Sequence, residues 1–127
     1  MKAEYKAKWV AALRSGDYEQ GRGQLNRDGK FCCLGVLSDI VKDELNAVWV
    51  EWGNGYAYHA PAVSEQEAAV LPISVINLVG MPNPSGTLPS GYRARYDVRQ
   101  LSIGLTALND DEGLTFDQIA DVVDYFF

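Results

Sequence analysis

Apolar residues recur at the spacing of an amphipathic helix along much of the chain. In residues 3–14, Tyr5, Trp9, Ala12 and Leu13 fall on one face, and the pattern stops just before a glycine. Such a stripe predicts a helix with one face in the core. The same pattern, with start and stop signals, predicts further helices over residues 31–45, from residue 64, over 73–80, over 100–109 and over 116–127.

The second predicted helix, residues 31–45, carries both cysteines of the chain. Cys33 falls on the apolar stripe that includes Leu37, which predicts a core position, whereas Cys32 lies nearer the boundary. Gly35 costs about 1 kcal/mol of helix propensity relative to alanine. We therefore expect a neighbouring element to approach the helix backbone closely there.

Alternating aromatic and β-branched residues in residues 48–59 predict a β-hairpin. Asn54-Gly55 is a favoured two-residue turn, and a type I′ turn at these residues would pair Glu51 with Tyr58. One face of the hairpin is then expected to carry Trp49, Glu51, Tyr56 and Tyr58, and the other face Trp52, Ala57 and His59.

Local signals complete the predicted architecture. Ser64 with Glu67, and Thr115 with Gln118, have the spacing of capping boxes, and Pro72 suits the first position of a helix. We expect a loop over 17–30 with one short strand, a turn at 27–29, an exposed loop over 81–91 and a strand over 92–96. The prediction is a single α+β domain, residues 1–127, with about five helices packed on a small antiparallel sheet.

Composition and charge restrict the class of protein. The chain has 127 residues, 22% of them charged, and a net charge of −6. An acidic total argues against duplex nucleic acid as the partner, because phosphate neutralisation drives that binding. No apolar run approaches the roughly 20 residues of a membrane span, and the N-terminus does not resemble a signal peptide. We expect a soluble protein of the cytosol that does not bind membranes.

The cysteine pair leaves three interpretations open, one of which is a redox-sensing thiol. Cys32 could be a nucleophile near a helix start, with Lys30 lowering its pKa and His59 as base. Another is that both thiols are packed as small apolar groups. Two adjacent cysteines and one histidine match no standard zinc pattern, so we predict no metal site, no cofactor and no catalytic residue.

Arginines and aromatic residues form the most informative set. Arg22 stands in Gly21-Arg22-Gly23, and three more arginines, at 93, 95 and 99, follow the proline-rich loop. Guanidinium groups bind phosphate through paired N–H donors, and aromatic rings stack on bases. The predicted ligand-binding residues are Arg22, Trp49, Tyr56, Tyr58, Arg93 and Arg95. The alternative is that the aromatic residues belong to the core and the arginines to a solvated strand face.

Two segments carry a family resemblance. Residues 12–40 read ALRSGDYEQGRGQLNRDGKFCCLGVLSDI and residues 105–123 read LTALNDDEGLTFDQIADVV; residues 71–81, LPISVINLVGM, match more weakly. Together they resemble a group of small phage and prophage proteins with no assigned activity. The resemblance implies a mobile-element origin and the cytosol of a bacterial host, and it implies no catalytic residue.

Three functions follow as hypotheses. The first is a non-enzymatic protein that sequesters a small anionic, nucleotide-type ligand, such as a signal of host antiviral defence. The second is an inhibitor that presents six acidic residues of 110–127 to a host protein. The third is a cysteine-dependent hydrolase. A homo-oligomer is left open.

Overall fold

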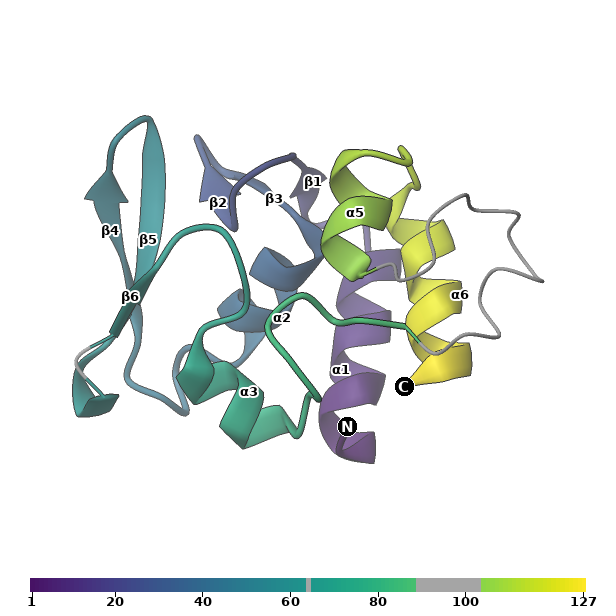
Figure 1. Ribbon diagram of the computed structural model, residues 1–127, viewed down its shortest axis with the longest axis horizontal. Helices are drawn as coiled ribbons and strands as arrows, with labels where there is room; N and C mark the ends of the chain where they lie inside the picture. Colours follow the sequence, from purple (N-terminus) through teal and green to yellow (C-terminus); the bar gives the residue numbers. More distant parts are fainter. Residues whose placement is uncertain (64, 89–103) are drawn as a thin grey trace.

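The computed structural model describes residues 1–63, 65–88 and 104–127, and its fold is α+β (Figure 1). Five α-helices lie in these ranges: α1 (Ala3–Arg14), α2 (Cys33–Ile40), α3 (Ile73–Val79), α5 (Leu105–Asp110) and α6 (Phe116–Phe126). The strands are β1 (Glu19–Gln20), β2 (Asn26–Arg27), β3 (Lys30–Phe31), β4 (Val48–Trp52), β5 (Gly55–Ala60) and β6 (Glu65–Glu67), and Pro61–Val63 form a 3-10 turn.

The strands form one mixed sheet, with the hairpin β4–β5 at one end of the molecule and α1 and α6 side by side at the other (Figure 1). The strand order is β1-β3-β2-β5-β4, and β6 pairs with β5. Only β1 and β3 run parallel among the described pairs. The predicted antiparallel sheet is therefore correct except at this edge, where a parallel strand joins it.

The core forms where α2 meets α1, α5 and the sheet. Trp9, Leu25 and Cys33 are fully buried, and the indole Nε1 of Trp9 donates a hydrogen bond to the Cys33 carbonyl at 2.9 Å. A Cβ built on Gly35 would lie 1.9 Å from the carbonyl oxygen of Leu25. The predicted close approach at Gly35 is confirmed, and the approaching element is the segment that leads into β2.

The hairpin register differs from the prediction. Glu51 pairs with Tyr56 and Trp49 with Tyr58, because the turn residues are Gly53-Asn54 instead of Asn54-Gly55. Gly53 has φ +59 whereas Asn54 keeps a negative φ, which is the pattern of a type II′ turn. The expected pairing of Glu51 with Tyr58 is therefore wrong by two residues. A shift of two residues preserves side-chain faces, so the predicted grouping of residues on each face is confirmed.

Residues 65–67 form a strand instead of the predicted helix. They pair antiparallel with β5, from Tyr58 opposite Glu67 to Ala60 opposite Glu65. The Glu65 carboxylate accepts hydrogen bonds from the backbone N–H of Ile73 at 2.6 Å and from the hydroxyl of Ser74. This carboxylate caps α3 from the strand that precedes it, a role that a capping pattern of four residues cannot reveal.

Two helices and one loop also differ from the prediction. The second helix begins at Cys33 and ends at Ile40, shorter than the predicted 31–45, and α5 begins at Leu105. The loop that follows α3 is not fully exposed, because Met81 and Leu88 are buried. The capping box of Thr115 and Gln118 on α6 is confirmed. The predicted strand over 92–96 lies outside the described residues.

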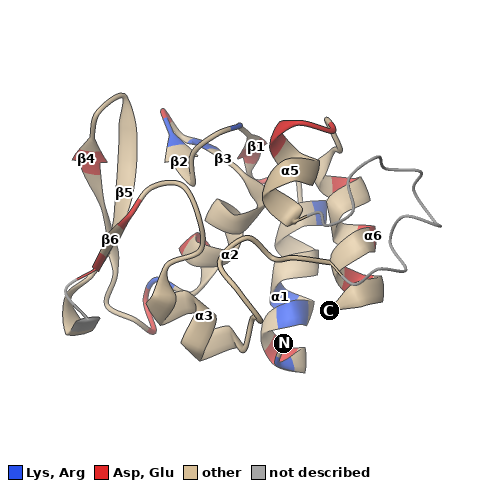
Figure 2. Cartoon of the chain, in the orientation of Figure 1, with Lys and Arg blue, Asp and Glu red and all other residues tan. Residues whose placement is uncertain are grey.

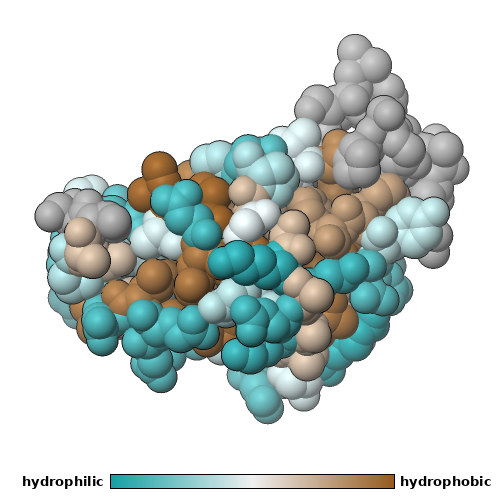
Figure 3. Space-filling view, turned by 90° about the horizontal axis from the view of Figure 1, so that it is seen from below, coloured by the Kyte–Doolittle hydropathy of each residue, from teal (hydrophilic) through white to brown (hydrophobic). Residues whose placement is uncertain are grey.

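The surface carries apolar side chains between hydrophilic ones, as the face seen from below shows (Figure 3). Large apolar side chains that are exposed in the described ranges include Val48 and Trp52 on the edge strand β4. A homo-oligomer stays a prediction. None of the described helices has the length and apolar content to cross a bilayer.

Candidate anion-binding site

A cavity of about 470 Å³ lies over the short strands β1 to β3. Among the described residues, its lining carries Arg22, Arg27 and Lys30 as cations and Asp28 as a carboxylate, together with Gln20 and Gly21. Figure 2 shows the basic residues on the β2–β3 hairpin and on the loop after β1, with acidic residues on the turn that follows α5. Of the predicted site residues that the structure describes, Arg22 lines this cavity.

A tight turn brings two of the cations together. Arg27 pairs directly with Lys30 across the β2–β3 hairpin, so their side chains lie on the same face. The two residues between them, Asp28 and Gly29, have φ +52 and +80. Positive φ at both central positions is the type I′ pattern, and the sequence Asp-Gly favours it. The predicted turn at residues 27–29 is therefore confirmed.

Hydrogen bonds from a distant segment fix the loop that carries Arg22. The buried side chain of Asn109 donates to the Gly21 carbonyl at 2.8 Å, and its oxygen accepts from the Gln20 amide at 2.9 Å. The same oxygen accepts from the Cys33 N–H at 3.2 Å. The Gly21 N–H donates to Phe31 on β3 at 2.8 Å. Asn109 thus joins the two segments that carry the family resemblance.

The sequence did not point to Asn109 as a positioning residue. It is the last residue of a predicted helix and precedes an acidic turn, so an exposed position would suit it equally well. In the structure it is fully buried. Only its place in the resembling segment 105–123 distinguishes it from other asparagines.

Two of the three cations lack a partner. Within the described ranges, the guanidinium groups of Arg22 and Arg27 make no ion pair and no hydrogen bond. Lys30 lies 3.7 Å from the Glu19 carboxylate, and both side chains are mostly exposed. An exposed pair of this kind is weak. The cavity can therefore present planar donors, unpaired among the described residues, to an anion, and such donors suit phosphate groups.

The predicted aromatic residues separate into two groups. Tyr58 is fully buried, and its ring meets the Trp49 ring edge to face at 5.0 Å. Trp49 also donates to the Asp39 carboxylate at 2.9 Å. These two rings are part of an aromatic cluster inside the molecule, and in this structure Tyr58 offers no face to a ligand. The hydroxyl of Tyr58 is buried without a hydrogen-bond partner in the described ranges, and burial raises its pKa.

Tyr56 is the predicted aromatic residue that lies beside the cationic cavity. It is half-buried and lines a second cavity of about 360 Å³ together with Glu51 and the turn of the β4–β5 hairpin. Asp28 lines both cavities. Arg22 and Tyr56 are therefore in neighbouring cavities, whereas Arg93 and Arg95 lie outside the described residues.

The cysteines are buried in a way that suppresses thiolate formation. Cys32 and Cys33 are free thiols in the interior. Burial raises the pKa of Cys32 to about 11 and the pKa of Cys33 well above its ordinary value. His59 lies on β5, where its Nδ1 is 3.1 Å from the Glu65 carbonyl. Burial of both thiols favours the packing interpretation over the nucleophilic one.

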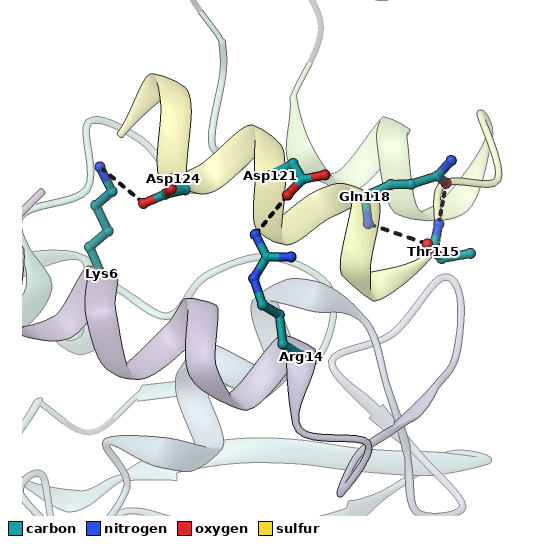
Figure 4. A network of polar contacts seen from close by, with 6 residues as sticks. All are labelled: Lys6, Arg14, Thr115, Gln118, Asp121 and Asp124. Atoms are coloured by element: carbon teal, nitrogen blue, oxygen red, sulfur yellow. Dashed lines mark hydrogen bonds and ion pairs between the residues drawn. The ribbon is translucent and has the colours of Figure 1, made fainter.

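Part of the C-terminal acidity is paired within the molecule. Arg14 of α1 donates to Asp121 of α6 at 2.7 Å, and Lys6 lies 4.0 Å from Asp124 (Figure 4). Two of the six acidic residues of 110–127 thus face basic residues of the same chain. This pairing weakens the acidic surface that a protein inhibitor would need.

No group of three or more histidine, cysteine, aspartate or glutamate side chains in the described ranges is placed to hold a metal ion.

The fold and this cavity define the class: an α+β domain with a basic cavity over three short strands. The chain belongs to a family described as a domain of unknown function, DUF8296, whose family model matches residues 1–127. No curated protein and no solved structure matches it.

Proposed function

We propose that this protein is a non-enzymatic binder that sequesters a small anionic, nucleotide-type ligand. The observation that carries the proposal is the cavity in which Arg22 and Arg27, both without an acidic partner in the described ranges, lie with Lys30. A protein of net charge −6 that gathers cations in one cavity creates a local attraction for anions.

The backbone around the cavity is held in place, and no activated nucleophile lies beside it among the described residues, which supports binding over catalysis. A type I′ turn fixes Arg27 and Lys30, and Asn109 fixes the loop of Arg22. A fixed backbone lowers the ordering cost of binding, and the exposed side chains that carry the donors become ordered on the anion itself. The described residues next to the cavity provide no activated nucleophile, since burial raises the pKa of Cys32 to about 11.

The biological role follows from the resemblance to phage proteins. A phage protein in the cytosol of a bacterial host that removes a nucleotide signal would weaken a host antiviral defence. Arg93 and Arg95 stay in this proposal as candidate contacts, on the basis of their sequence alone.

Isothermal titration calorimetry tests the binding proposal. The titrants are cyclic nucleotides, ADP-ribose, nucleoside diphosphates and inorganic pyrophosphate. We expect at least one to bind to the wild-type protein, with an affinity that falls as salt concentration rises. Absence of heat with every titrant would overturn the proposal.

A matched pair of double variants locates the site. Replacing Arg22 and Arg27 with alanine removes two charge-assisted donors, and we expect a loss of affinity of about tenfold or more. Replacing Lys8 and Arg14 removes the same charge from α1 and should change the affinity by no more than about twofold, because exposed distant charges are screened. Equal losses in the two variants would place the binding site elsewhere.

A further inference from the structure

Asp28 marks a change in electrostatic character between two neighbouring cavities. On one side it lines the cavity of Arg22, Arg27 and Lys30. On the other side it lines the cavity of Glu51 and Tyr56, whose described lining residues include no lysine or arginine. Tyr56 pairs with Asn26 and therefore lies on the sheet face opposite Arg27 and Lys30. A ligand that extends over the Asp28 turn meets cations at one end and a carboxylate and a phenol at the other.

The two cavities are held next to each other by backbone pairing. Asn26 of β2 pairs with Tyr56 of β5. A Cβ built on Gly55 would lie 2.8 Å from the Asn26 carbonyl oxygen and 3.3 Å from the Arg27 Cα. The two strands are therefore in direct contact beside the turn, and Asp28 keeps its place between the cavities.

The carboxylate of Asp28 has no internal role in the described ranges. It makes no ion pair and no side-chain hydrogen bond there, and the residue is exposed. An ionised carboxylate only accepts hydrogen bonds, and it repels phosphate. In a cavity for bare phosphate it would weaken binding. Beside a phosphate ester with free hydroxyl groups it would accept their hydrogen bonds.

We infer that the ligand is a ribonucleotide whose ribose hydroxyls donate to Asp28. This inference rests on the proposed function and names the ligand class and its orientation. The phosphates lie with Arg22, Arg27 and Lys30. The base lies toward Tyr56, whose half-buried ring can stack on it, and toward Glu51, which can accept from an amino group of the base. An acidic side chain that binds ribose hydroxyls is an established way to recognise nucleotides.

Paired titrations test the ribose contact. ADP, GDP, CDP and UDP are compared with their 2′,3′-dideoxy counterparts and with inorganic pyrophosphate. We expect at least one ribonucleotide to bind about tenfold or more tightly than its dideoxy counterpart, since a hydrogen bond to a charged group is lost. Pyrophosphate should bind more weakly than that ribonucleotide.

Two substitutions of Asp28 then assign the effect. Glycine and asparagine both tolerate the positive φ of this position, so the turn is preserved. Asp28→Gly should abolish the preference for ribose and strengthen pyrophosphate binding, and Asp28→Asn should fall between glycine and the wild type. Glu19→Gln, which removes a carboxylate beside Lys30 but outside the lining, is the control and should keep the preference.

The outcomes separate this inference from the proposed function. Pyrophosphate and dideoxynucleotides that bind as tightly as ribonucleotides would overturn the ribose contact and leave the anion site standing. A ribose preference that survives both substitutions of Asp28 would overturn the assignment to this residue. Absence of binding by every titrant would overturn both proposals.

Discussion

The basic residues in the contact between α1 and α6 and those in the segment 19–35 differ in whether an acidic side chain lies opposite them. Between the helices, Arg14 faces Asp121 and Lys6 faces Asp124. In the segment, the guanidinium groups of Arg22 and Arg27 face no carboxylate within 4 Å in the described ranges. In the first region the charges are paired within the protein. In the second, the two guanidinium groups are available to an anionic ligand.

The inner side of the segment 19–35 contrasts with its outer side. Inside, Cys33 and Gly35 are buried, and Asn109 satisfies the backbone groups around Gly21 and Cys33. The cations are confined to the outer side. The difference indicates that the inner side maintains the fold and that the outer side can vary in charge without unfolding the protein.

Gly35→Ala is expected to have the largest effect, on the inner side. The new Cβ would meet the Leu25 carbonyl at 1.9 Å, and backbone cannot move aside cheaply. We expect the free energy of unfolding to fall by about 3 kcal/mol or more. Chemical denaturation measures it. Ser38→Ala, at another buried position of α2, is the control and should cost about 1 kcal/mol, since it removes one hydrogen bond to Leu34. Equal effects would contradict the close approach.

Asn109→Ala is expected to rank second. It leaves the Cys33 N–H and the Gly21 carbonyl without their partner, and each such group costs about 1–3 kcal/mol when buried. We expect a total loss of roughly 2–3 kcal/mol, measured by chemical denaturation. Asn109→Asp keeps the acceptor for Cys33, but it places a buried carboxylate against the Gly21 carbonyl and the Asp110 carboxylate, so it should cost at least as much as Asn109→Ala. A stability equal to wild type in Asn109→Ala would show that the network is dispensable.

The helical half of the fold could be predicted because its signals are local. The stripe of Trp9 and Leu13 and the capping box of Thr115 and Gln118 act within a few residues of each other, and both were confirmed. The strand at 65–67 could not be predicted in this way. Its pairing with β5 and the capping of α3 by Glu65 join residues that lie farther apart than the four positions of a capping box, and they override that pattern.

The candidate site was predictable only in part, for a similar reason. Guanidinium chemistry and the glycines around it singled out Arg22, and the Asp-Gly turn was visible in the sequence. The contribution of Arg27 and Lys30 depends on their pairing across that turn, and that of Asn109 on a contact across 88 residues. Trp49 and Tyr58 are the residue types that stack on bases. Whether their rings are exposed depends on tertiary packing, which the sequence does not show.

The buried thiols give a third prediction, a loss of stability at high pH. Burial raises the pKa of Cys32 from about 9 in the unfolded chain to about 11 in the folded one. A raised pKa stabilises the fold fully below pH 9, and this contribution is lost as pH rises through 11. At pH 10 the loss is about 1 kcal/mol.

Thermal unfolding from pH 7 to pH 10.5 measures this effect. Cys32→Ala is compared with the wild type, because Cys33, the partly buried Tyr18 and the buried Tyr58 also have raised pKa values and are present in both proteins. The melting temperature of the variant should fall less steeply above pH 9. Parallel curves would show that Cys32 does not ionise on unfolding.

Arg14→Ala is expected to have the smallest effect on stability. Arg14 and Asp121 are 2.7 Å apart, and the hydrogen bond raises the pKa of Arg14, yet both side chains are largely exposed. Solvent and salt screen such a pair, and its side-chain entropy cost offsets the attraction. The melting temperature should fall slightly at low salt and should match the wild type at about 1 M salt, where the Debye length is about 3 Å. Asp121→Asn should behave alike, and the double variant should lose no more than either single variant, because each breaks the same pair. A large loss that persists at high salt would show that the contact of α1 with α6 depends on this pair. The paired charges of α1 and α6 would then differ from the cations of the segment 19–35 in two ways: they would stabilise the fold, and they would not be free to bind a ligand.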